Sequence, residues 1–184
     1  MKKVALSIVS VVAIGLMAFT PIADKLVSSK SHVKFYSHTA VEDIEANNYK
    51  TVSTIDPSTG VVVFSVPMQS FEFEKSLMQK HFNSPKFLDT KANPKAKLKG
   101  TISNLDDIDF SKDGSYTANV KGDMTINGKT NAIEEKASIT IKDGKTSLKS
   151  TFNLLLADYE VAFEKGKPSN NIAKEVEVTI HTEY

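Results

Sequence analysis

The chain has 184 residues, a length that suits one domain. It contains no cysteine, which excludes disulfides, thiolate chemistry and cysteine-linked lipid attachment. All 23 basic residues are lysine and 22 residues are acidic, so the chain lacks the excess positive charge typical of nucleic-acid-binding proteins. It also lacks the arginine fork that binds phosphate with two hydrogen bonds. We therefore expect no nucleic-acid partner.

The N-terminus has the pattern of a secretory signal peptide. Lys2 and Lys3 precede an uncharged, mostly apolar run over 4–19, which is short for a membrane span. We predict a signal peptide over 1–23, with an uncertain cleavage site, and one domain over 24–184. The mature protein is then periplasmic or secreted. A retained membrane anchor is the alternative interpretation of the same run.

Alternating apolar and polar residues predict strands in the first part of the mature chain. Residues 26–39 alternate, and 41–56 continue less regularly, with a bend expected near 47–48. Asp-Pro-Ser-Thr-Gly at 56–60 predicts a turn. The run over 61–68 is apolar on both faces, so we expect the barrel interior to cover one face and a packed helix the other.

One segment has helical rather than strand periodicity. The apolar residues Leu77, Met78 and Phe82, with Phe73 one turn earlier, form an apolar stripe on one side of a helix. We predict this helix over 71–83, ending at Ser84-Pro85. An amphipathic helix in an otherwise β chain needs an apolar surface to lie on. The open end of a barrel is the simplest such surface, so the helix is expected to be a lid or plug.

Strand patterns resume after the helix and continue to the C-terminus. Turn dipeptides separate them, of which Asn127-Gly128 is the strongest hairpin signal. The predicted strands cover 95–105, 116–126, 132–142, 148–156 and 176–184. We therefore predict an all-β, antiparallel barrel of about eight strands with one amphipathic helix between strands, which leaves room for one ligand.

The order of short motifs resembles that of the YceI-like family. The motifs are S-x-V-x-F at 31–35, S-F-E-F at 70–73, L-M-x-x-H-F at 77–82, K-F-L-D at 86–89, G-D-M-T-I-N-G at 122–128 and A-D-Y at 157–159. The resemblance covers the chain after residue 24 and implies a lipocalin-like barrel that binds a long apolar lipid of the polyisoprenoid type. Two positions depart from the family pattern. Glu74-Lys75 stands where many members have Arg-Asp, and Asn93 stands where many have an aromatic residue.

The expected ligand site is the apolar interior of the barrel. Its inward faces are assigned from the resemblance and from the preference of aromatic residues for the enclosed side. The expected ligand-binding residues are Phe35, Val63, Met78, Phe82, Phe87, Tyr116, Met124, Ile139 and Phe152, with Val33 beside them in the wall. Met78, Phe82 and Phe87 are expected to close one end.

No pattern predicts catalysis, a cofactor or a metal site. The four histidines, of which only His81 lies near the expected mouth, lack metal-ligand spacing. The acidic residues Glu42, Asp43 and Glu45 are candidates for acid/base chemistry and Ser70 or Ser76 for a nucleophile, but no histidine follows these serines in a recognised catalytic motif. The leading hypothesis is an exported carrier of an isoprenoid lipid, with transient membrane contact. An exported barrel with a structural or stress-response role and no enclosed lipid is one alternative, and a lipid-modifying enzyme is another. The oligomeric state stays open, with a homodimer among the options.

Overall fold

The computed structural model describes residues 24–184, apart from 29, 162, 165–166 and 169. The predicted signal peptide lies outside the described residues. Within the described part of the chain, no helix is long and apolar enough to cross a membrane.

The described chain is mostly β, as predicted. The strands are β1 (Leu26–Val27), β2 (Lys30–His38), β3 (Asp43–Asn48), β4 (Val52–Ile55), β5 (Val61–Pro67), β6 (Phe71–Phe73), β7 (Lys95–Ile102), β8 (Gly114–Ile126), β9 (Lys129–Lys142), β10 (Lys145–Leu155), β11 (Phe163–Glu164), β12 (Lys167–Pro168) and β13 (Glu175–Glu183). The helices are α1 (Ser76–Asn83) and the short 3-10 turns η1 (Met68–Ser70), η2 (Leu105–Asp107) and η3 (Leu156–Tyr159).

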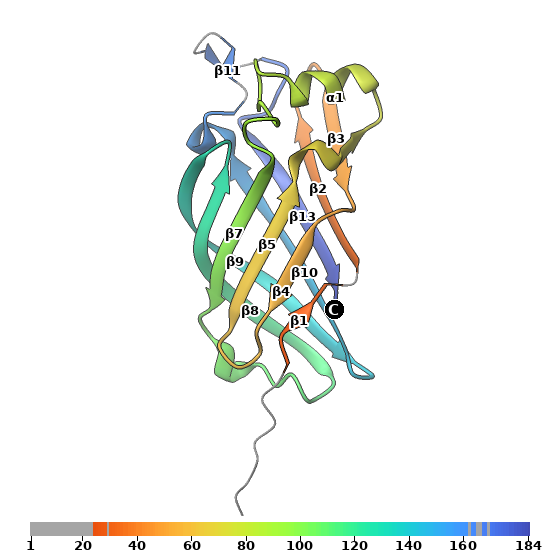
Figure 1. The fold of residues 1–184 in the computed structure, drawn as a ribbon, viewed down its shortest axis with the longest axis vertical. Helices are drawn as coiled ribbons and strands as arrows, with labels where there is room; N and C mark the ends of the chain where they lie inside the picture. The colour runs from red at the N-terminus through yellow and green to blue at the C-terminus, as the bar shows by residue number, and fades with distance from the viewer. Residues whose placement is uncertain (1–23, 29, 162, 165–166, 169) are drawn as a thin grey trace, which may run out of the picture.

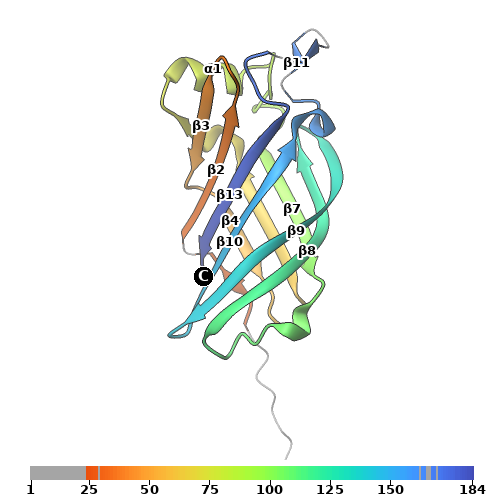
Figure 2. The same ribbon diagram turned by 180° about the vertical axis from the view of Figure 1, so that it is seen from behind.

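Eleven strands form one antiparallel sheet in the order β1-β4-β5-β7-β8-β9-β10-β13-β2-β3-β6, and β11 pairs with β12 separately. The sheet curls into a barrel, with α1 at one end (Figure 1). Figure 2, the view from behind, shows β10 and β13 side by side. These two strands are paired antiparallel from Ser147 with Glu183 to Leu155 with Glu175. The sheet has three more strands than the expected eight. The predicted strand over 26–39 is divided into β1 and β2, the predicted bend divides the next segment into β3 and β4, and β6 forms where a helix was predicted.

Side chains connect the two ends of the curled sheet. Asn48, at the end of β3, is fully buried, and its Nδ2 donates a hydrogen bond of 2.8 Å to the carbonyl oxygen of Pro67 on β5. The hydroxyl groups of Ser53 on β4 and Tyr184 after β13 lie 2.9 Å apart. These contacts satisfy buried polar groups where the sheet ladder ends.

The tight hairpin turns follow local sequence chemistry. Asn127 and Gly128 have φ of 51° and 71°, and Asp143 and Gly144 have φ of 51° and 72°. Two successive left-handed residues suit a two-residue hairpin, and Asn, Asp and Gly tolerate this conformation best. The turns predicted between β8 and β9 and between β9 and β10 are therefore confirmed.

The helix is shorter than predicted. Residues 71–73 form β6, which pairs with β3 through Asn48 and Phe71 and through Ala46 and Phe73. Phe71 and Phe73 are two residues apart, so strand geometry places both rings on one face, whereas a helix would separate them. The helical interpretation of this segment was wrong because an edge of the sheet was available for pairing.

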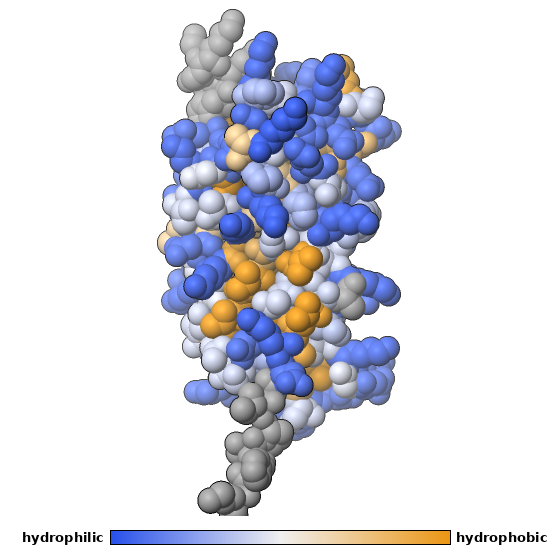
Figure 3. All heavy atoms as spheres, viewed as in Figure 1, coloured by the Kyte–Doolittle hydropathy of each residue, from blue (hydrophilic) through white to orange (hydrophobic). Residues whose placement is uncertain are grey.

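The faces of β5 also differ from the prediction. Phe64 pairs with Leu98 and Val62 with Gly100 on the inner side, so Val63 points outward together with Thr54 and Lys99. α1 packs against β6 and does not cover the outer face of β5. Figure 3 shows apolar side chains gathered over β1, β4 and β5, where Val27 and Val52 are exposed. The expected inward position of Val63 and the expected helical cover of β5 were both wrong.

Candidate functional site

A cavity of about 580 Å³ occupies the half of the barrel next to α1. Strands β2, β5, β7, β8, β10 and β13 supply most of its wall, and α1 with the following loop covers the end. Its lining is predominantly apolar. The volume lies within the range typical of small-molecule pockets.

Six of the nine predicted ligand residues line this cavity. They are Phe35, Met78, Phe82, Phe87, Met124 and Phe152, and the neighbouring Val33 joins them. They come from β2, α1, the segment after α1, β8 and β10. The structure therefore brings together residues separated by more than a hundred positions in the sequence.

The other three predicted residues lie elsewhere. Val63 is on the outer face of β5. Ile139 is fully buried in the packed half of the barrel away from α1, and Tyr116 is its cross-strand partner there. The Tyr116 hydroxyl donates a hydrogen bond of 3.1 Å to the carbonyl oxygen of Lys112. The expectation that these three residues line the same space as Phe82 was wrong, because Val63 faces outward and the cavity beneath α1 ends before it reaches the level of Tyr116 and Ile139.

Phe82 is the centre of an aromatic cluster at the covered end. Its ring centroid lies 5.7 Å from Phe35, 5.6 Å from Phe71, 5.0 Å from Phe73 and 6.2 Å from Phe87. Such separations are typical of favourable aromatic pairs. Phe82 is only 7% exposed, so it supports the fold as well as lining the cavity.

The other helical residues of the predicted stripe differ from Phe82. Met78 is half-buried and lines the cavity, whereas the adjacent Leu77 is 60% exposed. The helix thus presents a narrow apolar face, with Phe82 as its buried anchor.

Sequence reasoning missed several cavity residues. They include Phe64, Met68, Phe71, Phe73 and Leu98. A signal for Phe64 was present, since it is the only aromatic residue in the run over 61–68 and the preference of aromatics for the enclosed side would select it over Val63. Phe71 and Phe73 were missed as wall residues because their segment was predicted to be helical.

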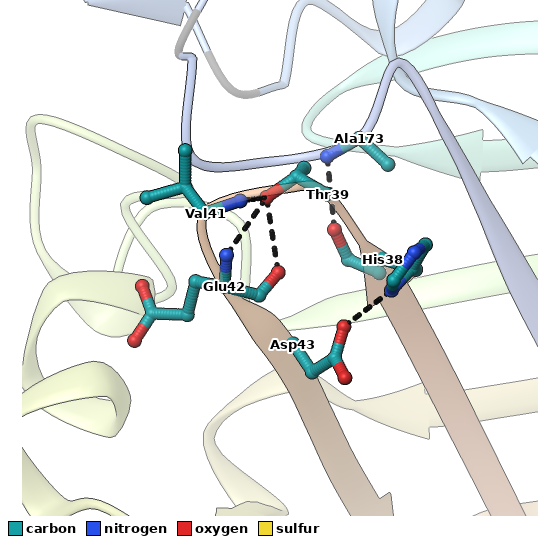
Figure 4. Close-up of polar contacts among 7 residues, drawn as sticks. His38, Thr39, Val41, Glu42, Asp43 and Ala173 are labelled. Atoms are coloured by element: carbon teal, nitrogen blue, oxygen red, sulfur yellow. Dashed lines mark hydrogen bonds and ion pairs between the residues drawn. The ribbon is translucent and has the colours of Figure 1, made fainter.

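Polar contacts order the rim around the covered end. Thr39 Oγ1 accepts hydrogen bonds from the backbone N–H groups of Val41 and Glu42, at 3.2 and 3.0 Å, in the β2–β3 turn (Figure 4). The backbone N–H of Ala173, in the segment before β13, donates a 2.9 Å hydrogen bond to Ser37 Oγ. The β2–β3 hairpin is thereby tied to a segment more than 130 residues away.

The three acidic residues of this hairpin have separate partners. Glu42 forms an ion pair with Lys75 at 3.3 Å, and Glu45 forms one with Lys34 at 3.6 Å. His38 Nδ1 lies 2.6 Å from Asp43 Oδ1, and this hydrogen bond lowers the pKa of the Asp43 carboxyl group. These carboxylates are engaged at the rim rather than aimed at a shared substrate position.

One histidine, His81, lies at the mouth of the cavity. His81 lines the cavity entrance and is exposed. Across the part of the chain that the structure describes, no group of three His, Cys, Asp or Glu residues is arranged to hold a metal ion. The predominantly apolar lining of the cavity can exclude water from the apolar surface of a ligand.

A comparison with protein-family profiles identifies one family. The profile of the YceI-like domain matches residues 25–184. Among curated protein sequences, none matches the chain.

Similar solved structures include BcnA of Burkholderia cenocepacia, with a TM-score of 0.70 and 18% identity over 84% of this chain and 96% of that one. A polyisoprenoid binding domain from Saccharophagus degradans has a TM-score of 0.70 and 12% identity over 86% and 96% of the two chains. A YceI protein from Campylobacter jejuni has a TM-score of 0.59 and 17% identity over 80% and 87%. At these low sequence identities, the structural similarity shows that this chain shares its fold with these proteins.

Proposed function

The chain belongs to the YceI-like family, and from this premise we propose that it encloses the apolar tail of an isoprenoid-type lipid in its cavity and carries it outside the cytoplasm. The observation that carries the proposal is the covered apolar cavity of about 580 Å³. The relative from Saccharophagus degradans is described as a polyisoprenoid binding domain, which supports the choice of ligand class.

Apolar burial is the expected source of affinity. Removing apolar surface from water is favourable by about 25 cal/mol per Å², so several branched units provide substantial affinity without a charged contact. Methionines such as Met68 and Met124 adapt to irregular ligand shapes because their side chains are flexible. The polar head of the lipid is then expected to stay near the rim, with a smaller share of the binding free energy.

Export is part of this proposal. The basic and apolar segments over 1–23 have the pattern of a signal peptide, and a periplasmic or secreted location would place the protein where lipids must cross water between membranes. Intact mass of the protein recovered from outside the cytoplasm should correspond to a chain that begins near Asp24. A recovered product that still contains Met1 would contradict removal of the segment.

The rim around α1 is proposed to touch a membrane transiently while the lipid transfers. Val41 is 69% exposed and Leu77 is 60% exposed, and an ion pair between Glu42 and Lys75 joins their neighbouring segments. Exposed lysines on and after α1, Lys80 and Lys86, would favour an anionic surface. Co-sedimentation with phosphatidylglycerol vesicles should decrease in a Val41→Ser/Leu77→Ser variant. Equal co-sedimentation of both proteins would contradict this contact.

Native mass spectrometry tests lipid enclosure directly. The protein purified without organic solvent should carry an apolar adduct, and extraction followed by addition of geranylgeraniol should restore a one-to-one complex. A barrel with only a structural or stress-response role would show neither. Chemical conversion of the added lipid without a cofactor would indicate an enzyme instead.

A matched pair of variants on α1 locates the ligand. Met78→Asp places a short charged side chain at the cavity lining and should weaken geranylgeraniol binding by about tenfold. Leu77→Asp introduces the same charge one residue away on the exposed face and should leave binding unchanged. Equal loss in both variants would argue against enclosure under α1.

A further inference from the structure

The cavity ends about halfway along the barrel. On β5, Phe64 lines it, but Val62, the next inward residue, does not and is only 1% exposed. On β7 and β8 the lining likewise includes Leu98 and Met124 but stops before Gly100 and Gly122. These three neighbouring strands therefore mark one common floor.

A close approach of two strands helps to form this floor. Gly100 and Gly122 are cross-strand partners, and a Cβ built on Gly122 would lie 2.3 Å from the Gly100 Cα. A Cβ built on Gly100 would lie 3.0 Å from Val120 Cγ1, so Val120 already fills the space that Gly100 leaves. The glycine pair consequently gives no extra depth to the cavity.

The space below the floor is occupied by packed side chains. They include Ile55, Ile102, Ala118, Ala137, Ile139 and Leu148, all buried. Packed interiors of this kind rarely contain voids larger than a water molecule. A lipid tail that enters beneath α1 therefore meets a closed end at Val62 and Val120.

The volume above the floor sets a capacity. A water molecule occupies about 30 Å³ in the liquid, so a cavity of about 580 Å³ holds roughly 20 groups of that size. A methylene or methyl group has a similar size, and an isoprene unit contributes five carbons. Resting on the proposed function, we propose that the cavity encloses about four isoprene units and that Val62 and Val120 set this limit. Any further length of a longer lipid stays at the mouth.

A series of prenols of increasing length tests the limit. Affinities for geraniol (C10), farnesol (C15), geranylgeraniol (C20) and a C40 polyprenol are measured by native mass spectrometry in the same detergent. Affinity should rise by about tenfold or more for each unit added up to C20 and by less than about threefold from C20 to C40. A continued rise of more than about tenfold to C40 would overturn the limit while supporting lipid binding. Failure of every prenol to bind would instead overturn the proposed function.

Two variants with opposite expected effects test the residues. Val62→Ala/Val120→Ala removes four carbons at the floor and should raise the preference for a C25 prenol over geranylgeraniol by about fivefold or more. Val33→Phe adds bulk to the deep part of the cavity wall and should move the plateau to farnesol. Ile141→Val, in the packed half, is the control and should leave the length profile unchanged. Unchanged profiles in the folded test variants, or a shift in the control, would overturn the assignment of the floor.

Discussion

The two halves of the barrel interior are both apolar and both contain aliphatic residues, but they differ in how many phenylalanines and methionines they contain. The half next to α1 contains a cavity, and its wall includes seven phenylalanines and three methionines, namely Phe35, Phe64, Phe71, Phe73, Phe82, Phe87, Phe152, Met68, Met78 and Met124. The inner side of the other half is filled mainly by isoleucine, valine, alanine and leucine. Compact side chains with few rotamers pack across the axis, whereas the rings contact one another along the wall. Apolar character alone therefore does not decide whether a barrel is hollow.

The largest expected effect on stability is in the packed half. Ile139→Ala should lower the free energy of unfolding by about 4 kcal/mol, because it removes three carbons from a fully buried site and leaves a void that its neighbours cannot fill. Urea denaturation measures this loss. Geranylgeraniol affinity of the folded protein should not change, and a marked decrease would contradict the separation of the two halves.

Phe82→Ala should have a slightly smaller effect on stability, about 3 kcal/mol, although it removes more atoms. Phe82 already borders open space, so the penalty for creating a new cavity is reduced. Unlike Ile139→Ala, it should also weaken lipid binding, measured by native mass spectrometry. A loss of stability well above that of Ile139→Ala would indicate that the covered end is packed rather than hollow.

Tyr184, at the end of the packed half, predicts a response to alkaline pH. Burial raises the pKa of Tyr184 to about 12, although the hydrogen bond with Ser53 partly opposes this. The unfolded chain ionises this phenol near pH 10, whereas the folded state keeps it neutral up to about pH 12. The free energy of unfolding is therefore unaffected below pH 10 and falls as the pH rises towards 12. The loss should be about 2 kcal/mol in the parent protein.

Tyr184→Phe is the matching variant for this pH effect. It should be less stable by about 1 kcal/mol at pH 8, where it lacks the hydrogen bond with Ser53. It should also lose less stability than the parent between pH 10 and 12, as measured by urea midpoints. Lysine deprotonation affects both proteins and cancels in the comparison. Equal alkaline losses would mean that Tyr184 is not protected from ionisation.

The smallest expected effect is at the rim. Lys75→Ala removes the exposed ion pair with Glu42 and should change the free energy of unfolding by less than about 0.5 kcal/mol. Lipid retention should be unchanged, since Lys75 does not line the cavity. If Lys75→Ala abolished retention in mass spectrometry while Met78→Asp left it intact, a charged head-group site would replace the apolar cavity as the basis of binding.

Local sequence chemistry alone determined much of this protein. Asn127-Gly128 and Asp143-Gly144 specify their hairpins because few other residues adopt left-handed conformations so readily. Alternation specified most strands, and an ordered set of motifs pointed to the family. Of the expected cavity residues, Phe35, Met124 and Phe152 were identified from alternation, the preference of aromatics for the enclosed side and the family resemblance.

Only the tertiary structure decided the faces and the depth of the interior. The run over 61–68 is apolar in both registers, so its pairing with β7 selects Phe64 over Val63 for the interior. Residues 71–73 become β6 because β3 offers an unpaired edge. The position of the floor depends on Val62, Gly100 and Val120, which meet only when β5, β7 and β8 are side by side. Periodicity within one segment carries no information about such contacts, because the space available at each level is set by side chains from distant strands.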